Sequence, residues 1–196
     1  MGSAIVTKTQ GRTRWQKVAR RVRVPLGFVV AAVFLMFARS NWHTLGWSLL
    51  LVIPGLWLRG YAAGYVKKNA ELTRTGPYAY TRNPLYLGSM GIAFGFAVGA
   101  GRVWLGVLLV VMFLAIYVPT ILSEETFLRA AFPSFDVYAK RVPRLLPRLT
   151  PARFADVGTE GGRFLTERYV HHREYNALMG AAAIYAALML RMLLRH

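Results

Sequence analysis

Five long apolar stretches constrain what this chain can fold into more than any other feature of its sequence. None contains Asp, Glu, Lys or Arg, and Arg102 alone separates the third from the fourth. The stretches cover residues 24–38, 44–58, 85–101, 103–122 and 176–190. Because about 20 apolar residues cross the core of a bilayer, the fourth is long enough by itself, and the others reach that length with flanking aromatic and basic residues that snorkel. The sequence predicts an all-α integral membrane protein with about five transmembrane helices.

The distribution of basic residues predicts which side of the membrane each loop faces. Lys and Arg number 25 against 8 Asp and Glu, which gives a formal net charge of +17. Residues 1–23, 59–84 and 124–175 hold seven, five and nine of the basic residues, and four lie elsewhere. By the positive-inside rule these three segments face the cytoplasm, so we expect a multi-pass protein of the inner (cytoplasmic) membrane. The charge flanks the spans, which indicates membrane lipid and no nucleic acid as a partner.

The apolar and charged segments divide the chain into four regions. Residues 1–23 are a basic interfacial segment, 24–147 a membrane core, 148–175 a cytoplasmic interfacial segment and 176–196 a C-terminal transmembrane helix. The first apolar run begins after about twenty polar residues and no small-residue cleavage site follows it, which argues against a secretory signal. The chain has no Cys, which excludes disulfides, thiolate metal sites and cysteine nucleophiles.

A polar motif precedes the third apolar stretch. It runs from Glu71 to Gly88 and reads ELTRTGPYAYTRNPLYLG, with turn signals at Gly-Pro and Asn-Pro. Pro84 suits the first turn of a helix, and Asn83 suits its N-cap. A helix N-terminus at the membrane face leaves N–H groups free to bind a carboxylate, and Arg82 adds guanidinium donors beside them. A capped helix start with interfacial tyrosines is the alternative interpretation.

Two adjacent carboxylates follow the fourth apolar stretch. We expect Glu124 and Glu125 to open the second cytoplasmic loop at the membrane boundary, where an uncompensated carboxylate is costly. Arg129, one turn further on, could compensate Glu125, and Arg82 is the alternative partner. The aromatic and basic residues 132–147 end in two prolines, which is typical of a short helix followed by an extended strip on the membrane surface.

Glycines recur every fourth residue along the third stretch, at Gly91, Gly95 and Gly99, with Gly88 out of step. Small residues at this spacing predict close packing against a neighbouring helix, with a lipid groove as the alternative. Elsewhere, residues 8–23 and 160–175 combine basic and aromatic residues. This pattern predicts two interfacial amphipathic helices.

The two polar motifs together resemble the superfamily of isoprenylcysteine carboxyl methyltransferases and phospholipid methyltransferases, which are integral membrane enzymes. The resemblance rests on Gly-Pro-Tyr-x-Tyr-x-Arg-Asn-Pro-x-Tyr-x-Gly before one span, Glu-Glu after the next, and Tyr-x-Lys-Arg-Val-Pro-x-x-x-Pro beyond it. It covers residues 72–147 and implies S-adenosylmethionine as the methyl donor, with S-adenosylhomocysteine as the product, in a cytoplasm-facing pocket. It also implies a lipid-like acceptor that enters sideways from the bilayer.

Carried over position by position, the family motif implies a set of cofactor-binding residues. They are Gly76, Tyr78, Arg82, Asn83, Pro84, Tyr86 and Glu125, with Glu124 beside it. Arg82, Glu124 and Glu125 are the candidate catalytic residues, with Arg82 facing the cofactor's carboxylate and Glu125 its ammonium group. Many members have His at the position of Asn83. Because Asn does not titrate near neutral pH, only a hydrogen-bonding role is expected there.

The chemistry of a sulfonium donor limits what such an enzyme must do. The methyl group is already activated, so the protein aligns the acceptor, excludes water and needs no metal. A lipid amine requires a proton acceptor such as Glu124 or a tyrosine, whereas a carboxylate acceptor requires none. We expect a lipid amine, with the carboxylate of a prenylated cysteine as the alternative. No obligate protein partner is indicated, and His171 and His172, outside the motifs, are expected to be surface residues.

Two other classes of membrane protein remain open. A reductase of the sterol reductase type has a similar arrangement of spans, but this chain has only five apolar stretches and lacks the glycine fingerprint of dinucleotide-binding proteins. A non-enzymatic adaptor or a small transporter is expected to carry ionisable residues inside its spans, and these five stretches carry none of Asp, Glu, Lys or Arg.

Overall fold

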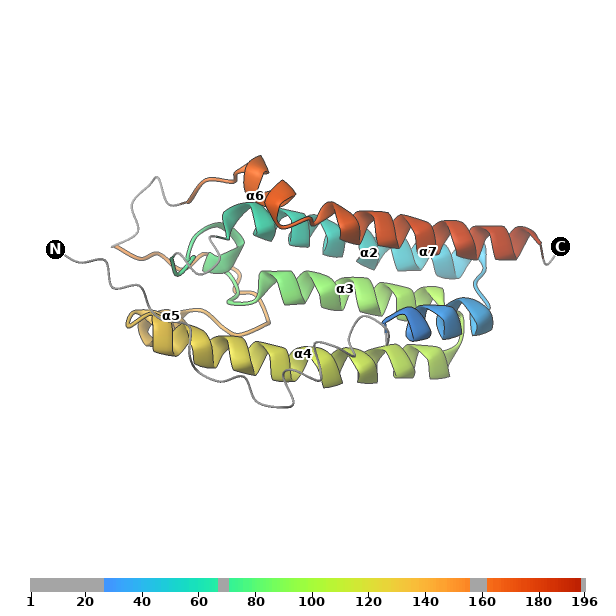
Figure 1. The fold of residues 1–196 in the computed structure, drawn as a ribbon, viewed down its shortest axis with the longest axis horizontal. Helices are drawn as coiled ribbons and strands as arrows, with labels where there is room; N and C mark the ends of the chain where they lie inside the picture. Colours follow the sequence, from blue (N-terminus) through green and yellow to red (C-terminus); the bar gives the residue numbers. More distant parts are fainter. Residues whose placement is uncertain (1–26, 67–70, 156–161, 195–196) are drawn as a thin grey trace.

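The computed structural model describes residues 27–66, 71–155 and 162–194, and within these ranges every regular element is a helix (Figure 1). The predicted all-α fold class is confirmed. The expected basic interfacial segment, residues 1–23, lies outside the described residues.

The long helices lie side by side along one axis of the molecule. A helical segment, Gly27–Phe37, comes first. The elements that follow are α2 (Trp42–Tyr65), the 3₁₀ helix η1 (Gly76–Ala79), α3 (Pro84–Gly99), α4 (Val103–Ala131), α5 (Phe135–Arg141), α6 (Thr166–His171) and α7 (Tyr175–Leu193). In Figure 1, α3 lies in the middle, with α2 and α7 on one side and α4 on the other.

The helices give the protein an apolar exterior. Three of them, α2, α4 and α7, are long and apolar enough to cross a membrane, and Gly27–Phe37 and α3 are shorter apolar helices. All five predicted apolar stretches are therefore largely helical. By length and composition, three of these helices are candidate membrane spans and two are too short to be counted as such. Large apolar side chains such as Trp47, Trp57 and Leu190 are exposed on the outside. Water solvates such a surface poorly and lipid solvates it well, and the chain is an integral membrane protein.

Helix α4 extends beyond the stretch that the sequence marks as apolar. It continues to Ala131, so Glu124 and Glu125 lie on the helix. The expectation that these carboxylates open a loop is wrong. The residues that follow them are mostly good helix formers, and the helix ends only at Phe132, the residue before Pro133. The helix thus carries both carboxylates in a fixed orientation.

The glycines of α3 allow it to approach α2 closely. A Cβ atom built on Gly88 would lie 2.6 Å from the Gly55 carbonyl oxygen, and one built on Gly95 would lie 2.9 Å from the Ser48 carbonyl oxygen. Gly91 faces the same helix, with its Cβ position 3.4 Å from the Leu51 carbonyl oxygen. The predicted close packing is confirmed, and Gly88, out of step in the sequence, belongs to the same interface. A lipid groove along this face is excluded by the backbone that fills it.

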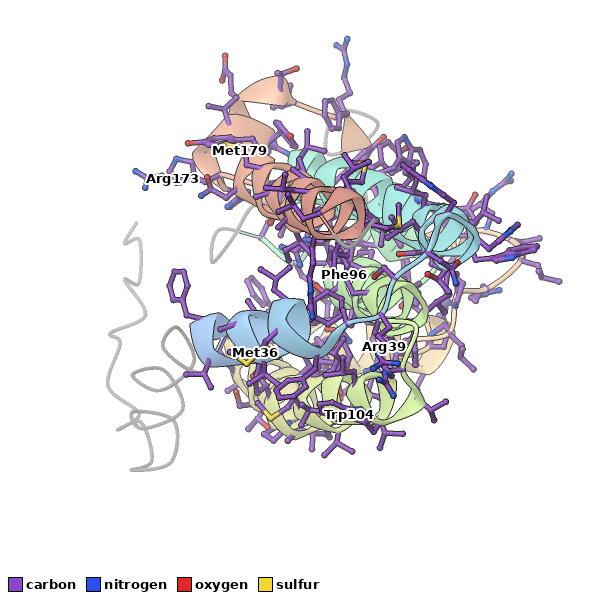
Figure 2. All side chains as sticks on the ribbon, turned by 90° about the vertical axis from the view of Figure 1, so that its right-hand side faces the viewer. Met36, Arg39, Phe96, Trp104, Arg173 and Met179 are labelled. Atoms are coloured by element: carbon purple, nitrogen blue, oxygen red, sulfur yellow. The ribbon has the colours of Figure 1, made fainter. Side chains whose placement is uncertain are left out.

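Helix α7 completes the apolar core of the bundle. Figure 2 looks along the bundle and shows Phe96 between the helices, while Met36 and Met179 lie on the outside. The Phe96 ring meets that of Tyr185 on α7 at 5.4 Å, and the Tyr185 hydroxyl hydrogen-bonds to that of Ser48 on α2 at 2.5 Å. Aromatic contacts and one satisfied polar pair therefore fix α7 against α2 and α3.

The segment before α7 differs from the predicted interfacial helix. Helix α6 covers only Thr166–His171, and Arg173 has a positive φ of 54°, which interrupts the helix before α7 begins. Backbone contacts dock this segment on the end of α2, where Leu165 N–H donates to the Gly64 carbonyl at 3.0 Å. His171 is exposed and His172 partly so, as expected for surface residues.

We predict that Gly95→Ala destabilises the fold by about 2 kcal/mol, because the added methyl group must displace the α2 backbone at Ser48. Gly46→Ala is the matched control: nothing lies within 4 Å of its Cβ position, so the substitution should be neutral or slightly stabilising. Thermal unfolding in detergent measures both. Equal midpoints for the two variants would contradict the close approach of α2 and α3.

Candidate active site

The first polar motif is held in place by residues 142–152, which we call the strap. Three backbone hydrogen bonds join the motif and the strap: Arg82 N–H donates to the Pro143 carbonyl at 2.9 Å, Arg148 N–H to the Tyr80 carbonyl at 3.0 Å, and Ala152 N–H to the Ala79 carbonyl at 2.9 Å. The sequence predicted an extended strip lying on the membrane surface. The strap contains no helix or strand and bends at residues 142, 144–146 and 149–150, so it is not a continuous extended strip; it pairs with the loop before α3. The third part of the family motif therefore supports the first part directly.

Asn83 shows how the strap changes the expected helix cap. Asn83 occupies the N-cap position of α3, and its carbonyl accepts a hydrogen bond from Leu87 N–H at 3.0 Å. Its side chain makes no cap: Nδ2 donates to the Arg144 carbonyl at 2.9 Å. The predicted side-chain cap is wrong because a strap carbonyl takes the amide. Asn83 instead fixes the backbone at Arg144.

Glu125 is the centre of a buried ionic cluster. The residue is only 4% exposed, and one carboxylate oxygen lies 3.4 Å from Nη2 of Arg82. Arg144 Nη2 and Nε donate to the Glu125 carboxylate at 2.9 and 3.1 Å. Arg129 instead pairs with Asp136 at 2.8 Å on the exposed surface. Of the two partners predicted for Glu125, Arg82 is confirmed and Arg129 is wrong. Arg144 is a further partner that no local sequence pattern predicts.

The cluster has a net positive charge and a hydrogen-bond donor that an anion could use. Two guanidinium groups face one carboxylate, so the formal charge of the three side chains is positive. Arg82 Nε is buried and makes no hydrogen bond with any described residue. The Arg144 side chain is about half exposed, and its hydrogen bond to Glu125 raises its pKa, which keeps it charged. A buried donor without an acceptor is unfavourable, and a bound carboxylate would satisfy it.

Glu124, the neighbour of Glu125, has different surroundings. Its carboxylate accepts a hydrogen bond from the Tyr86 hydroxyl at 2.8 Å. Within the described part of the chain, no Lys or Arg forms an ion pair with it. The Tyr86 ring in turn meets that of Tyr117 edge to face at 5.5 Å. One carboxylate of the pair is therefore neutralised by arginines, and the other lies among aromatic rings.

Two buried tyrosines lie behind the cluster. The Tyr138 hydroxyl donates to the Tyr78 carbonyl at 2.8 Å, and both side chains are buried. Burial raises the pKa of the Tyr78 phenol well above its usual range, and nearby Tyr138, Glu124 and Glu174 raise it further. Burial also raises the pKa of Tyr138. Both phenols are therefore neutral across the physiological range.

A comparison with protein families identifies one matching segment of this chain. Residues 47–134 match the phospholipid methyltransferase family. The resemblance to the superfamily of isoprenylcysteine and phospholipid methyltransferases is thereby confirmed. The phospholipid methyltransferase segment contains Arg82, Glu124 and Glu125, whereas Arg144 lies beyond its end.

Two curated relatives carry names that refer to metal resistance. The cobalt-zinc-cadmium resistance protein CzcN of Cupriavidus metallidurans is 33% identical over 139 residues, which cover 65% of this chain and 62% of that protein. The nickel-cobalt-cadmium resistance protein NccN of Alcaligenes xylosoxydans xylosoxydans is 32% identical over 132 residues, 62% of this chain and 61% of that protein. This chain thus matches about three fifths of the length of each relative. No solved structure matches it significantly.

The local backbone explains why position 76, within the phospholipid methyltransferase segment, is a glycine. Its φ is +56°, which favours glycine, and a Cβ atom there would overlap the ring of Tyr65 at the end of α2. Pro84 is buried at the first position of α3, as predicted. Neither residue is among the side chains that form the ionic cluster. Their expected role in cofactor binding therefore remains a prediction about the shape of the loop.

A second ion pair, which the sequence did not predict, joins α7 to this end of the bundle. Nε and Nη2 of Arg59 donate to the two oxygens of Glu174, each at 3.0 Å, and Nη1 donates to the Ser89 hydroxyl. Glu174 precedes α7, and its carboxylate also acts on the pKa of Tyr78. Nothing in the local sequence of Arg59 predicts a carboxylate partner so far along the chain.

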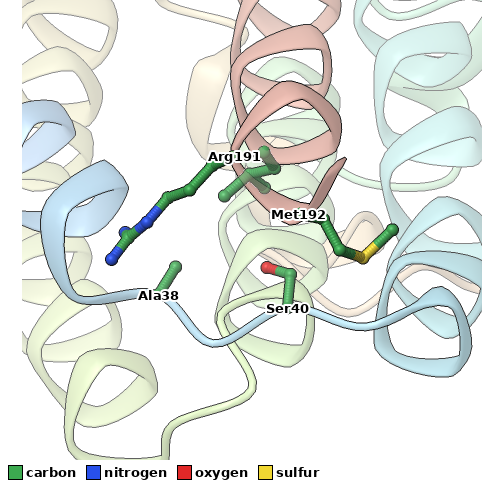
Figure 3. Close-up of a pocket in the computed structure, with 5 residues that line it drawn as sticks. Ala38, Ser40, Arg191 and Met192 are labelled. Atoms are coloured by element: carbon green, nitrogen blue, oxygen red, sulfur yellow. The ribbon is translucent and has the colours of Figure 1, made fainter. Parts of the chain in front are cut away.

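At the opposite end of the bundle, the described residues form a different feature. A small hollow there is lined by Ala38, Ser40, Leu188, Arg191 and Met192 (Figure 3). The Arg191 guanidinium donates to the Leu35 carbonyl near the end of the first helix. A cation beside the carbonyls of a helix C-terminus is stabilising, which accounts for Arg191 structurally.

The raised pKa values predict the pH dependence of stability. Above about pH 10 an unfolded chain loses tyrosine protons that the folded protein keeps at Tyr78 and Tyr138. The free energy of unfolding should therefore be highest below that pH, as far as these two phenols determine it, and should fall above it. Tyr78→Phe should reduce the fall. Thermal unfolding between pH 8 and pH 11 measures it, and an equal effect of Tyr80→Phe, at an exposed phenol, would contradict the assignment to the buried phenol.

Proposed function

We propose that this protein is an integral membrane methyltransferase that uses S-adenosylmethionine to methylate a membrane-embedded, lipid-like amine. The observation that carries the proposal is the contact between Arg82 and Glu125. Both residues belong to the motifs that carry the family resemblance, lie far apart in the sequence and meet at 3.4 Å in the structure. The residues around this contact are also suited to S-adenosylmethionine.

The ionic cluster fits the amino-acid part of the cofactor. Arg82 has a buried donor without an acceptor among the described residues, and Arg144 offers a half-exposed guanidinium beside it, so the pair suits a carboxylate. Glu125 holds both arginines and keeps them oriented. Asn83 positions Arg144 through its backbone. We propose that Gly76, Tyr78, Pro84 and Tyr86 shape the rest of the pocket, as the family motif implies.

The two glutamates take different roles in this proposal. When bound, S-adenosylmethionine supplies a methyl group activated by the adjacent sulfonium. A lipid amine is protonated near neutral pH and must lose a proton before it reacts. Glu125 already uses its carboxylate oxygens to hold Arg82 and Arg144. Glu124 has no such partner among the described residues, so we assign proton acceptance to it. Buried Tyr78 and Tyr138 help to exclude water from this region.

The surroundings of the cluster favour a lipid acceptor. The exposed surface of α4 is apolar up to the turn that carries the glutamates. On the other side, Lys140, Arg141, Arg144 and Arg148 gather around the strap, where they would attract anionic head groups. We propose that this end of the bundle faces the cytoplasm, in line with the distribution of basic residues, and that the protein is a multi-pass protein of the inner membrane.

Two alternative activities remain as competing proposals. Methylation of the carboxylate of a prenylated cysteine would use the same cofactor cluster and would leave Glu124 without a proton to accept. A reductase of the sterol reductase type would use a nicotinamide cofactor, and the match to the phospholipid methyltransferase family supports it less. The metal resistance in the relatives' names describes those proteins, and the absence of a metal cofactor in this chain stays a prediction.

We predict that Arg82→Ala weakens S-adenosylhomocysteine binding by roughly tenfold or more, because a charged ligand group loses its partner. Arg82→Lys should restore little, since a point charge does not reproduce the guanidinium fork. Glu125→Ala should act in the same direction by releasing both arginines. Isothermal titration of purified protein measures binding, with NADPH as the second ligand and Arg129→Ala as the control. Parental affinity in both alanine variants would contradict the cofactor site.

The lipid amine makes a separate prediction. Membranes incubated with methyl-labelled S-adenosylmethionine should yield label in the organic phase, on a product that resists mild base. The rate should rise with pH until the amine is largely neutral, whereas methylation of a carboxylate would change little. A base-labile methyl ester would support the prenylcysteine alternative. Label confined to the aqueous phase would rule out a lipid acceptor.

A further inference from the structure

One face of α4 connects Glu124 to the membrane interior. Phe113, Tyr117 and Glu124 lie within about 40° of one another around the helix, because each residue advances the helix by about 100°. Tyr117 is roughly 10 Å and Phe113 roughly 16 Å deeper along the helix than Glu124, at 1.5 Å per residue. All three side chains are partly exposed. The face therefore has a charged end near the cluster and an aromatic end inside the span.

The aromatic rings on this face form a continuous surface. The Phe113 and Tyr117 rings stack with centroids 4.2 Å apart and planes 14° apart. Tyr86 on α3 packs edge to face on Tyr117 and donates its hydroxyl to Glu124. The rings and the carboxylate are thus fixed relative to one another by two aromatic contacts and one hydrogen bond.

The charges at this place indicate a cationic ligand. Glu124 has no Lys or Arg partner within the described residues, whereas Glu125 has two. A partly buried carboxylate at a membrane boundary is stabilised by a cation, and the faces of aromatic rings also attract cations. A carboxylate beside aromatic rings therefore favours an ammonium group over a neutral or anionic one. A soluble cofactor has no group that would follow the apolar face towards Phe113.

We propose that Glu124, Tyr86 and Tyr117 bind the ammonium head group of an amphiphile, whose hydrocarbon chain lies along the α4 face towards Phe113. We call this the amine seat. It rests on the proposed function, since it gives the acceptor of that reaction a binding site next to the cofactor cluster. It also assigns roles to Tyr117 and Phe113, which lie outside the polar motifs.

The amine seat can be tested by binding, without methyl transfer. The probe is decyltrimethylammonium, which carries a permanent charge and no transferable proton, titrated into the full chain in a nonionic detergent. Decanol tests the chain without the charge. We expect the parent protein to bind decyltrimethylammonium at least roughly tenfold more tightly than decanol. Equal binding of the two would overturn the proposal, because the face would then be merely apolar.

Variants identify the residues of the seat. Glu124→Gln and Tyr117→Leu should each weaken binding of decyltrimethylammonium by roughly tenfold, and Tyr117→Phe, which keeps the ring, should remain close to the parent. Trp104→Leu, at an exposed aromatic residue on the opposite face of α4, and Glu167→Gln, at an exposed carboxylate on α6, are the matched controls. Parental binding in both test variants, or equal losses in the controls, would place the seat elsewhere.

Binding of S-adenosylhomocysteine to the same variants separates this inference from the proposed function. We expect the affinity of Glu124→Gln and Tyr117→Leu for S-adenosylhomocysteine to remain within about twofold of the parent. A parallel loss of affinity for S-adenosylhomocysteine would assign Glu124 to the cofactor and overturn the amine seat. A parent protein that binds decyltrimethylammonium selectively but binds no S-adenosylhomocysteine would overturn the proposed methyltransferase activity and leave the seat supported.

Discussion

The polar end of this structure depends on the carboxylate of Glu125 and the two guanidinium groups that face it. The three residues come from α4, from the loop before α3 and from the strap, so a single cluster joins three parts of the chain. A charge buried at a membrane boundary is tolerated only when its partners are fixed. The strap supplies that fixation, since its carbonyls accept hydrogen bonds from Arg82 and Asn83.

The apolar part of the bundle is held together by other interactions. Helices in lipid gain little from burying apolar surface against one another, so their association depends on close backbone contact and a few polar pairs. The glycines between α2 and α3 supply the contact. The bonds from Ser48 to Tyr185 and from Arg59 to Glu174 attach α7 at its middle and at its N-terminus. A rigid α2 and α3 pair then gives the first motif a fixed support.

The sequence predicted the parts of this structure that depend on local pattern. Apolar length marked the five helical stretches, glycine spacing marked the α2 and α3 contact, and the family motif brought Arg82 to Glu125. The sequence-based prediction failed where a residue far away in the sequence determines the local structure. Asn83 has the right type for a cap, but the Arg144 carbonyl takes its amide. The extension of α4 beyond residue 122 follows from helix propensity, which a search for apolar runs ignores. The bond between Arg59 and Glu174 joins residues whose local sequences say nothing of each other.

The adjacent glutamates illustrate how a helix separates two functions. Successive residues point about 100° apart around an α-helix, so neighbours in sequence face different surroundings. Glu125 faces the strap and two arginines, where its charge is satisfied within the protein. Glu124 faces Tyr86 and the aromatic rings of α4, where its charge is satisfied by a hydroxyl and has no arginine partner among the described residues. In a loop the two carboxylates could exchange places. Because α4 continues through both, one remains committed to holding the arginines, and the other stays available to a ligand that arrives along the membrane.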